Sequence, residues 1–279
     1  MQAFAGEQAL LARLTTALAK VQGVQAIVLG GSRARGITAV GSDYDIGLYY
    51  APGDPLDIES LNAVVATLDD TGPAARATAI GAWGPWINGG GWLTVGGTRV
   101  DLLYRDLARV RSCMDACRTG HVERHYQPGH PHAFVTAIYM GEVAYGRPLW
   151  DPTGVVAALK QQTHPYPKAL GEALIELFLP EAYFALDTAR HGRALDDPIY
   201  VLGCCFRSLA CLCQVVFAIN RTYLLNEKGA IEAAQGLARR PADLHARISA
   251  ALRDVMAGRV GAGLERLEAL VKETEALIA

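Results

Sequence analysis

Hydrophobic residues near the start of the chain recur every three or four positions, which is the spacing of one helix face. This spacing runs from Gln8 to Val21 and predicts an amphipathic helix, which Gly23 would end. The apolar run from Val24 to Leu29 is too short for a helix and long enough for a buried strand. The chain is therefore predicted to begin with a helix followed by a strand.

Residues 42–50, with the sequence SDYDIGLYY, alternate between two sets of side chains, as a strand does. One set is Asp43, Asp45, Gly47 and Tyr49, and the other is Tyr44, Ile46, Leu48 and Tyr50. A helix is predicted over residues 58–70. Residues 91–95 and 98–104 are predicted strands, because the Gly96-Gly97 dipeptide between them is a hairpin signal.

Beyond about Trp150 the apolar spacing is helical almost to the end of the chain. We therefore predict two domains, residues 1–150 and residues 151–279. The predicted fold class is α/β (α+β), with a small mixed sheet and flanking helices in the first domain and a helical bundle in the second.

The composition is globular, since 51% of the 279 residues are hydrophobic and 19% are charged. Lys and Arg number 26 and Asp and Glu number 28, so the net charge of −2 argues against binding nucleic acid by bulk charge. The longest apolar run, Val201 to Ile219, is interrupted by Arg207, Ser208 and Gln214, and the N-terminus lacks a secretory signal pattern. We expect a cytoplasmic protein without a membrane segment.

The first candidate chemistry is the turn Gly30-Gly31-Ser32, which follows the predicted buried strand. Glycines in such a turn let backbone N–H groups approach a phosphate, and a helix that starts there favours an anion. Turns between strands and helices commonly contain glycine, so this feature alone is weak evidence for phosphate binding.

Asp43 and Asp45 are the second candidate, because residues two apart on a strand point the same way. Two neighbouring carboxylates repel, and Mg²⁺ is the cation that such hard oxygen ligands prefer together with substrate phosphates. The alternative is a solvated strand with two surface acids. Asp101, in the strand-like sequence RVDLLYRD, would add a third carboxylate and complete a two-metal site.

In this order, GGSRARG, SDYDIGLYY and RVDLLYR resemble the nucleotidyltransferase superfamily, which includes DNA polymerase beta and the aminoglycoside nucleotidyltransferases. The superfamily's motif is Gly-Gly/Ser-Ser, a spacer, Asp-x-Asp on a strand, and a later Asp or Glu on an adjacent strand. The resemblance covers about residues 24–105. The helical remainder is more loosely similar to the small-molecule branch.

The resemblance implies roles for these residues. The turn at residues 30–32 would hold a triphosphate, and Asp43 and Asp45 would ligate two Mg²⁺ ions. Asp101 would ligate the catalytic metal and help to deprotonate an acceptor hydroxyl. The active site would lie in a cleft between the two domains.

Arginine and lysine candidates for phosphate binding flank this motif. Arg35, close to Arg33 beside the turn, would pair with phosphate or form a structural ion pair. Lys228, at the end of the polar stretch NRTYLLNEKG, would contact phosphate from the helical domain or belong to an ordinary helix end.

Further candidates concern the acceptor. His130 and His132 flank a proline in GHPHAF and would bind substrate or nucleotide, or simply be exposed. Glu142 and Glu181 are candidate general bases, although no motif places one. Trp83, Trp86 and Trp92 would stack on a base or sugar, but we favour a hydrophobic cap over the sheet.

The predicted activity is Mg²⁺-dependent transfer of a nucleoside monophosphate from a nucleoside triphosphate to a hydroxyl of a small-molecule acceptor, with release of pyrophosphate. An aminoglycoside-like acceptor is an analogy. The alternatives are a non-catalytic nucleotide-binding regulator or toxin–antitoxin component, and a transferase acting on RNA or protein. The sequence leaves open the base preference, the acceptor and the oligomeric state.

Overall fold

A computed structural model describes residues 2–35, 42–194 and 196–278. Gly36, the last residue of GGSRARG, lies outside the described residues. The chain divides into two compact units. The first comprises Met1–Asp115, Gln127–Gly129 and Tyr139–Pro165, and the second comprises Ala116–Tyr126, His130–Ile138 and Tyr166–Ala279.

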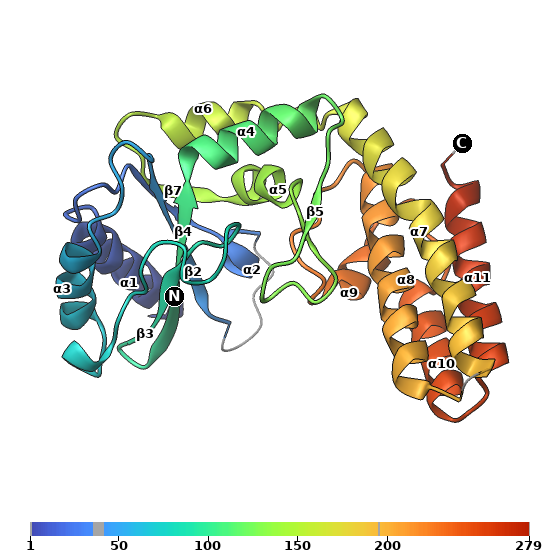
Figure 1. Ribbon diagram of the computed structural model, residues 1–279. Coiled ribbons are helices and arrows are strands. Elements are labelled where there is room, and N and C mark those ends of the chain that lie inside the picture. The colour runs from blue at the N-terminus through green and yellow to red at the C-terminus, as the bar shows by residue number, and fades with distance from the viewer. Residues whose placement is uncertain (1, 36–41, 195, 279) are drawn as a thin grey trace. The chain divides into compact units, whose positions relative to one another are not determined.

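The first unit is built on a five-stranded mixed sheet with the strand order β3-β4-β2-β1-β7 (Figure 1). Its strands are β1 (Ala26–Leu29), β2 (Tyr44–Tyr50), β3 (Gly90–Val95), β4 (Thr98–Asp106) and β7 (Arg147–Trp150). The neighbours β2 and β4 run parallel, and the other three pairs are antiparallel. The predicted mixed sheet is thus confirmed.

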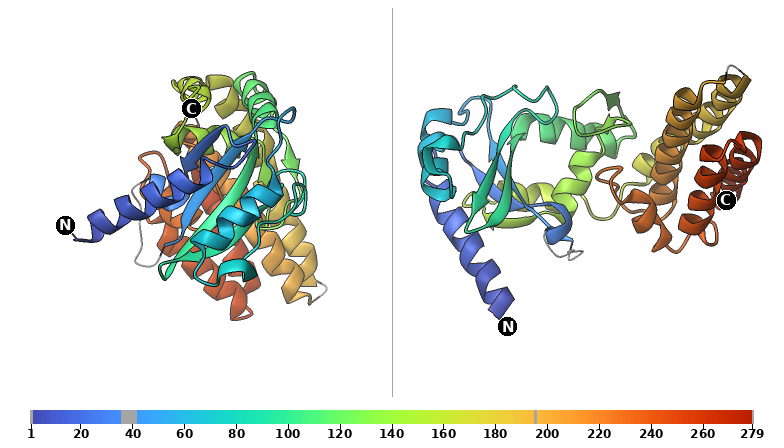
Figure 2. Two further views of the ribbon diagram at one scale, coloured as in Figure 1. Left: turned by 90° about the vertical axis from the view of Figure 1, so that its left-hand side faces the viewer. Right: turned by 90° about the horizontal axis from the view of Figure 1, so that it is seen from below.

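Several helices lie wholly or largely in the first unit beside this sheet. They are α1 (Gln2–Leu18), α2 (Gly31–Ala34), α3 (Ile58–Leu68), the 3-10 helix η1 (Gly72–Ala74), α4 (Leu107–Arg118), α5 (Ile138–Tyr145) and α6 (Val155–Gln161). Helices α1 and α3 lie along one face of the sheet (Figure 2). Their buried residues form one core with Tyr44, Ile46 and Leu48 of β2. The predicted alternation of β2 is confirmed, because Asp45 and Gly47 between them are only half-buried.

At the two edges of the sheet, one prediction is confirmed and one strand was missed. The β3–β4 hairpin turns at Gly96-Gly97 as predicted, and both residues have the positive φ angles, 59° and 73°, that such a turn needs. Strand β7 was not predicted, because its sequence RPLW contains a proline and shows no apolar alternation. It is an edge strand, which is where a sheet tolerates proline.

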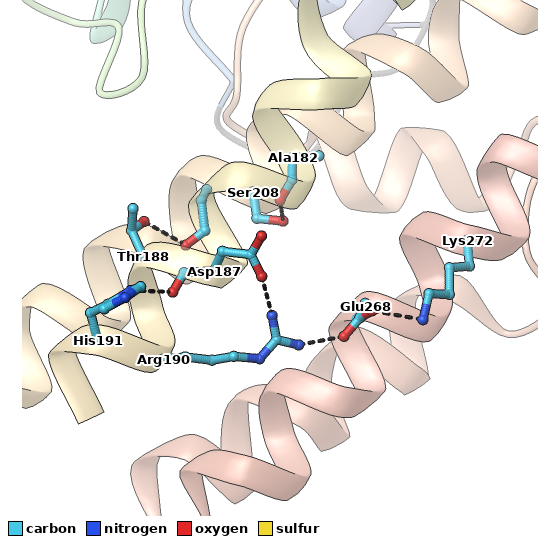
Figure 3. A network of polar contacts seen from close by, with 9 residues as sticks. Ala182, Asp187, Thr188, Arg190, His191, Ser208, Glu268 and Lys272 are labelled. Atoms are coloured by element: carbon cyan, nitrogen blue, oxygen red, sulfur yellow. Dashed lines mark hydrogen bonds and ion pairs between the residues drawn. The ribbon is translucent and has the colours of Figure 1, made fainter. Parts of the chain in front are cut away.

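The second unit contains a small β5–β6 pair and a group of helices. The elements are β5 (Arg124–His125), β6 (Phe134–Val135), α7 (Lys168–Ala194), α8 (Pro198–Ile219), α9 (Ala230–Gln235), α10 (Leu244–Met256) and α11 (Val260–Ala276). Figure 3 shows how Arg190 of α7 bridges Asp187 of the same helix and Glu268 of α11, which Lys272 also contacts. The predicted helical C-terminal region is confirmed.

Helix α8 is the one helix among the described residues that is long and apolar enough to cross a membrane, judged by length and composition. However, 72% of its most apolar window is buried inside the protein. Ser208 within it donates a hydrogen bond to the Ala182 carbonyl of α7 at 2.9 Å. Such burial is typical of a core helix.

Candidate active site on the mixed sheet

Asp45 and Asp101 lie side by side on the parallel strands β2 and β4, where they are register partners. Directly paired residues project to the same face of a sheet. Asp43 immediately precedes β2, and a position two residues before Asp45 lies on that same side. The structure therefore brings the three predicted carboxylates to the face opposite Tyr44, Ile46 and Leu48.

The environment of Asp45 disfavours its charged form. Burial, followed by the charges of Asp101, Asp43 and Glu142, raises the pKa of Asp45 to about 6, and Arg105 opposes this shift. A carboxyl group perturbed by burial and by neighbouring like charges is typical of a functional site. A cation bound beside Asp45 would remove the repulsion and favour the ionised form.

Gly31 approaches the Asp45 side chain directly. Its φ angle is +62°, and a Cβ atom there would lie 1.7 Å from Asp45 Oδ2. The adjacent Gly30 N–H donates to the Asp45 carbonyl at 2.8 Å. The carboxylate of Asp45 is thus one physical reason for glycine at position 31, and a role in phosphate binding stays a prediction for residues 30–32.

The helix expected after this turn is very short. Helix α2 spans only Gly31–Ala34, and Gly30 precedes it without a side-chain cap. The macrodipole of a helix sums over its peptide units, so four residues supply little of the field that we expected to favour an anion. Binding of a phosphate by Ser32 and its neighbours would depend on individual backbone and hydroxyl donors.

The two arginines beside the turn have different environments. Arg33 donates to the Ser42 carbonyl at 2.6 Å and the Asp43 carbonyl at 3.2 Å, and its guanidinium lies 3.7 Å from the centre of the Tyr44 ring. Arg33 therefore ties α2 to the start of β2. Arg35 follows α2 and is exposed, and its predicted contact with phosphate stays a prediction.

Asp43 has a cationic neighbour. Arg99 Nε lies 2.7 Å from Asp43 Oδ1, although this buried oxygen accepts no aligned hydrogen bond within the described part of the chain. The Arg99 side chain is 69% exposed, which makes this contact a surface ion pair rather than a fixed core contact. Among the described residues, no group of three or more His, Cys, Asp or Glu side chains is arranged to hold a metal ion.

Glu142 on α5 is paired with Arg105 on β4. Arg105 Nε and one terminal nitrogen donate to the two carboxylate oxygens at 2.7 and 2.6 Å, and the Arg105 side chain is only 4% exposed. This bidentate pair uses both Glu142 oxygens, which does not suit the expected role of a general base. It places a third carboxylate, after Asp101 and Asp43, close enough to raise the pKa of Asp45.

Arg105 is a site residue that the sequence analysis did not single out. It lies four positions after Asp101 on one strand and so shares its face. The sequence signal that could have identified Arg105 is an arginine inside an apolar strand. A buried charge needs a partner, so such an arginine predicts a nearby acid. The sequence could not show that Glu142, on a helix well along the chain, is that partner.

The histidine candidates belong to the second unit, where they surround Glu227. Glu227 Oε1 accepts hydrogen bonds from the backbone N–H groups of His132 and Ala133 at 2.9 and 3.2 Å. His130 Nδ1 lies 3.7 Å from Glu227 Oε2, beyond hydrogen-bond distance. Because Glu227 holds the loop through its backbone, the histidines have a structural setting, and their predicted contacts with substrate stay predictions.

Lys228 and Glu181 also lie in the second unit. Lys228 is exposed in the turn before α9, where its backbone N–H donates to Asn226 Oδ1 at 2.7 Å. Glu181 forms ion pairs with Arg124 and Arg207. Burial raises the pKa of Glu181, but hydrogen bonds and charges from these two arginines outweigh burial and bring that pKa below its usual value. A lowered pKa does not suit a general base.

Comparisons with known proteins add a loose likeness of fold. No family model matches the chain, and no curated protein matches it either. Among solved structures, the chain is similar to a nucleotidyltransferase-like protein from Exiguobacterium sibiricum 255-15, with 11% identity and a TM-score of 0.44 over 94% of this chain and 73% of that chain. This similarity is too low for residues to be matched between the two proteins.

Proposed function

We propose that the protein is a Mg²⁺-dependent nucleotidyltransferase that transfers a nucleoside monophosphate from a nucleoside triphosphate to a hydroxyl of a small molecule. The observation that carries the proposal is the register pair Asp45–Asp101, with Asp43 on the same sheet face. The raised pKa of Asp45, due to burial and to these two acids, supports it. A purely structural sheet gains nothing from carboxylates that repel one another.

The donor chemistry fits Mg²⁺. Carboxylate oxygens are hard ligands, and the like-charge repulsion at Asp45 is what a divalent cation would relieve. Mg²⁺ commonly takes one or two carboxylates and completes its shell with water and substrate phosphates, so three preassembled protein ligands are not required. Asp43, Asp45 and Asp101 would hold the metal, which when bound supplies stabilisation of negative charge on the phosphoryl oxygens.

The chain's own residues would divide the remaining work. Backbone groups of residues 30–32, with Arg35, would bind the triphosphate, and Asp101 would orient the acceptor hydroxyl and accept its proton. The acceptor oxygen forms a bond to the α-phosphorus while the bond from that phosphorus to the pyrophosphate oxygen breaks. Pyrophosphate leaves with the electron pair of that bond.

The test is thermal melting with Mg²⁺ and each of the four nucleoside triphosphates, for the wild type and for Asp45→Asn. Ligand at about 100 times its dissociation constant adds about 2.7 kcal/mol, which is a shift of a few degrees for a chain of this size. We expect a Mg²⁺-dependent shift that Asp45→Asn loses and that Asp54→Asn, at an exposed position of the same unit, retains. No shift in the wild type with any nucleotide would contradict nucleotide binding.

Turnover separates a transferase from a nucleotide-binding regulator. Pyrophosphate release should be measured with the nucleotide that gives the largest shift and a panel of small hydroxylated acceptors. Asp45→Asn and Asp101→Asn should each abolish Mg²⁺-dependent release. Near wild-type release in either variant would show that the metal-site assignment is wrong.

A further inference from the structure

A tryptophan continues the row of carboxylates across the sheet. Trp92 on β3 is the register partner of Asp101 on β4, which is in turn the partner of Asp45 on β2. Paired residues project to the same face, so the three side chains share the acidic face. Gly31 lies against the Asp45 carboxylate at the other end. We call this line of four residues, Gly31, Asp45, Asp101 and Trp92, the acidic row.

Trp92 is exposed to an extent that packing does not explain. It is 69% exposed, whereas the face of the sheet that forms the core is closed by buried hydrophobic side chains, tyrosines among them. We expected the tryptophans to form a hydrophobic cap over the sheet; Trp83 does lie over Gly90 of β3, but Trp92 remains largely exposed. A large indole left in water beside functional carboxylates is typical of a ligand-binding surface.

The indole is also held in place. Trp83 stacks on Trp92 with ring centroids 4.6 Å apart and an angle of 24° between the planes. Trp83 in turn lies over Gly90, where a Cβ atom would be 2.7 Å from the ring atom Cζ3. The buried Gln127 donates to the Trp83 carbonyl at 2.7 Å. This backing fixes the Trp92 ring, so that little side-chain entropy is lost when a ligand stacks on it.

We propose that Trp92 is the acceptor-binding residue and that it stacks on a ring that carries the acceptor hydroxyl. This inference rests on the proposed function. If the triphosphate lies at the Gly31 end of the acidic row, the attacking hydroxyl must reach the phosphorus from the Asp101 side, where Trp92 is the next residue. An indole face binds planar rings and the C–H face of sugar rings, so the acceptor class is a hydroxylated ring compound rather than an open-chain alcohol.

The test uses phenyl β-D-glucopyranoside as the ring probe and glycerol as the ring-free control, each followed by saturation-transfer NMR. The proteins are the wild type, Trp92→Ala, Trp92→Phe and a matched control, Tyr126→Ala, which removes another exposed aromatic side chain. We expect the ring probe to bind the wild type, Trp92→Ala to weaken it about tenfold, and Trp92→Phe to restore most of the affinity. Tyr126→Ala should bind as the wild type does.

Nucleotide binding decides which ligand uses the indole, and it is measured in the same proteins by the melting shift with Mg²⁺ and each of the four nucleoside triphosphates. The shift should be unchanged in Trp92→Ala. If Trp92→Ala loses it, the indole contacts the nucleotide base and the inference is overturned. Equal binding of the ring probe to the wild type and Trp92→Ala, or no preference for it over glycerol, also overturns it. If no nucleotide shifts the melting temperature of the wild type, the proposed function is contradicted. The ring-probe binding is measured without nucleotide, so it still tests the role of Trp92.

Discussion

Gly31 and Asp45 are packed so closely that a single added methyl group at position 31 would overlap the Asp45 carboxylate, with Cβ 1.7 Å from Oδ2. The two residues come from different elements, α2 and β2, and their contact fixes where the turn lies relative to the acidic row. Backbone conformation and site geometry are therefore linked at this point.

Gly31→Ala should be strongly destabilising. The alanine would need the left-handed φ of +62° and would also displace Asp45, so we expect a loss of about 2 to 4 kcal/mol. The control is Gly72→Ala, which has the same φ of +62° and whose added Cβ would meet only the Ala66 carbonyl at 3.9 Å. Urea unfolding of both variants separates the two effects, since Gly72→Ala should lose only the strain of about 1 kcal/mol. Equal losses would mean that the contact with Asp45 costs nothing.

Asp45→Asn should stabilise the metal-free protein near neutral pH. Because the folded pKa of Asp45, about 6, lies above the ordinary aspartate value of 3.8, the folded state holds the proton more tightly than the unfolded state does. Stability from this group is therefore full below about pH 4 and is lost as the pH rises through about 6. The loss at neutral pH is of the order of 3 kcal/mol at most.

Melting in EDTA over this pH range tests the prediction. The melting temperature of Asp45→Asn minus that of the wild type should increase between about pH 4 and pH 7, because the asparagine cannot ionise. Adding Mg²⁺ should reduce the difference, since the cation stabilises the ionised wild-type carboxylate. A pH-independent difference would show that Asp45 has an ordinary pKa.

Glu142→Gln should destabilise the first unit by about 3 kcal/mol, because it leaves the buried Arg105 guanidinium without its counter-ion. The matched control is Glu172→Gln, which breaks the exposed pair with Lys168 at 3.2 Å and should cost less than about 0.5 kcal/mol. Chemical unfolding gives both values. If the two substitutions cost the same, the Arg105–Glu142 pair contributes no more than a surface pair.

Glu227→Ala should loosen the loop at residues 130–133 without unfolding the protein. Its carboxylate accepts two backbone hydrogen bonds, and leaving those donors unpaired costs about 1 to 3 kcal/mol. Hydrogen exchange at His132 and Ala133 should accelerate in Glu227→Ala. Glu227→Gln keeps an acceptor oxygen, so most of the protection should remain, and equal exchange in the two variants would contradict the assigned contact.

Much of the first unit was predictable because its chemistry is local. The alternation in residues 42–50 identified β2 and placed Asp43 and Asp45 on one side, and Gly96-Gly97 identified the hairpin. Residues that act through distant partners were not predictable. Arg105 needs Glu142 from α5, and the exposed position of Trp92 depends on how Trp83 packs over Gly90.

The acceptor candidates show the opposite case, in which a residue type suggested chemistry that its surroundings do not favour. Glu142 was a candidate general base, but both of its oxygens are engaged by Arg105. Glu181 is paired in the same way with Arg124 and Arg207. A carboxylate's availability depends on the cations around it, and a single sequence does not show which arginine is close to which acid.

The parallel pairing of β2 and β4 also bears on when the acidic row is assembled during synthesis. Strands β1 and β2 are consecutive and antiparallel, so they can pair early, but Asp45 meets Asp101 only after β3 and β4 have been made and the long connection after β2 has closed. Non-local pairings of this kind form late in folding, because the entropy of loop closure is lost before the contacts form. A nascent chain that stalls before β4 would therefore present Asp45 without its partner. Under the proposed function, affinity for a divalent cation would then report that the sheet is complete.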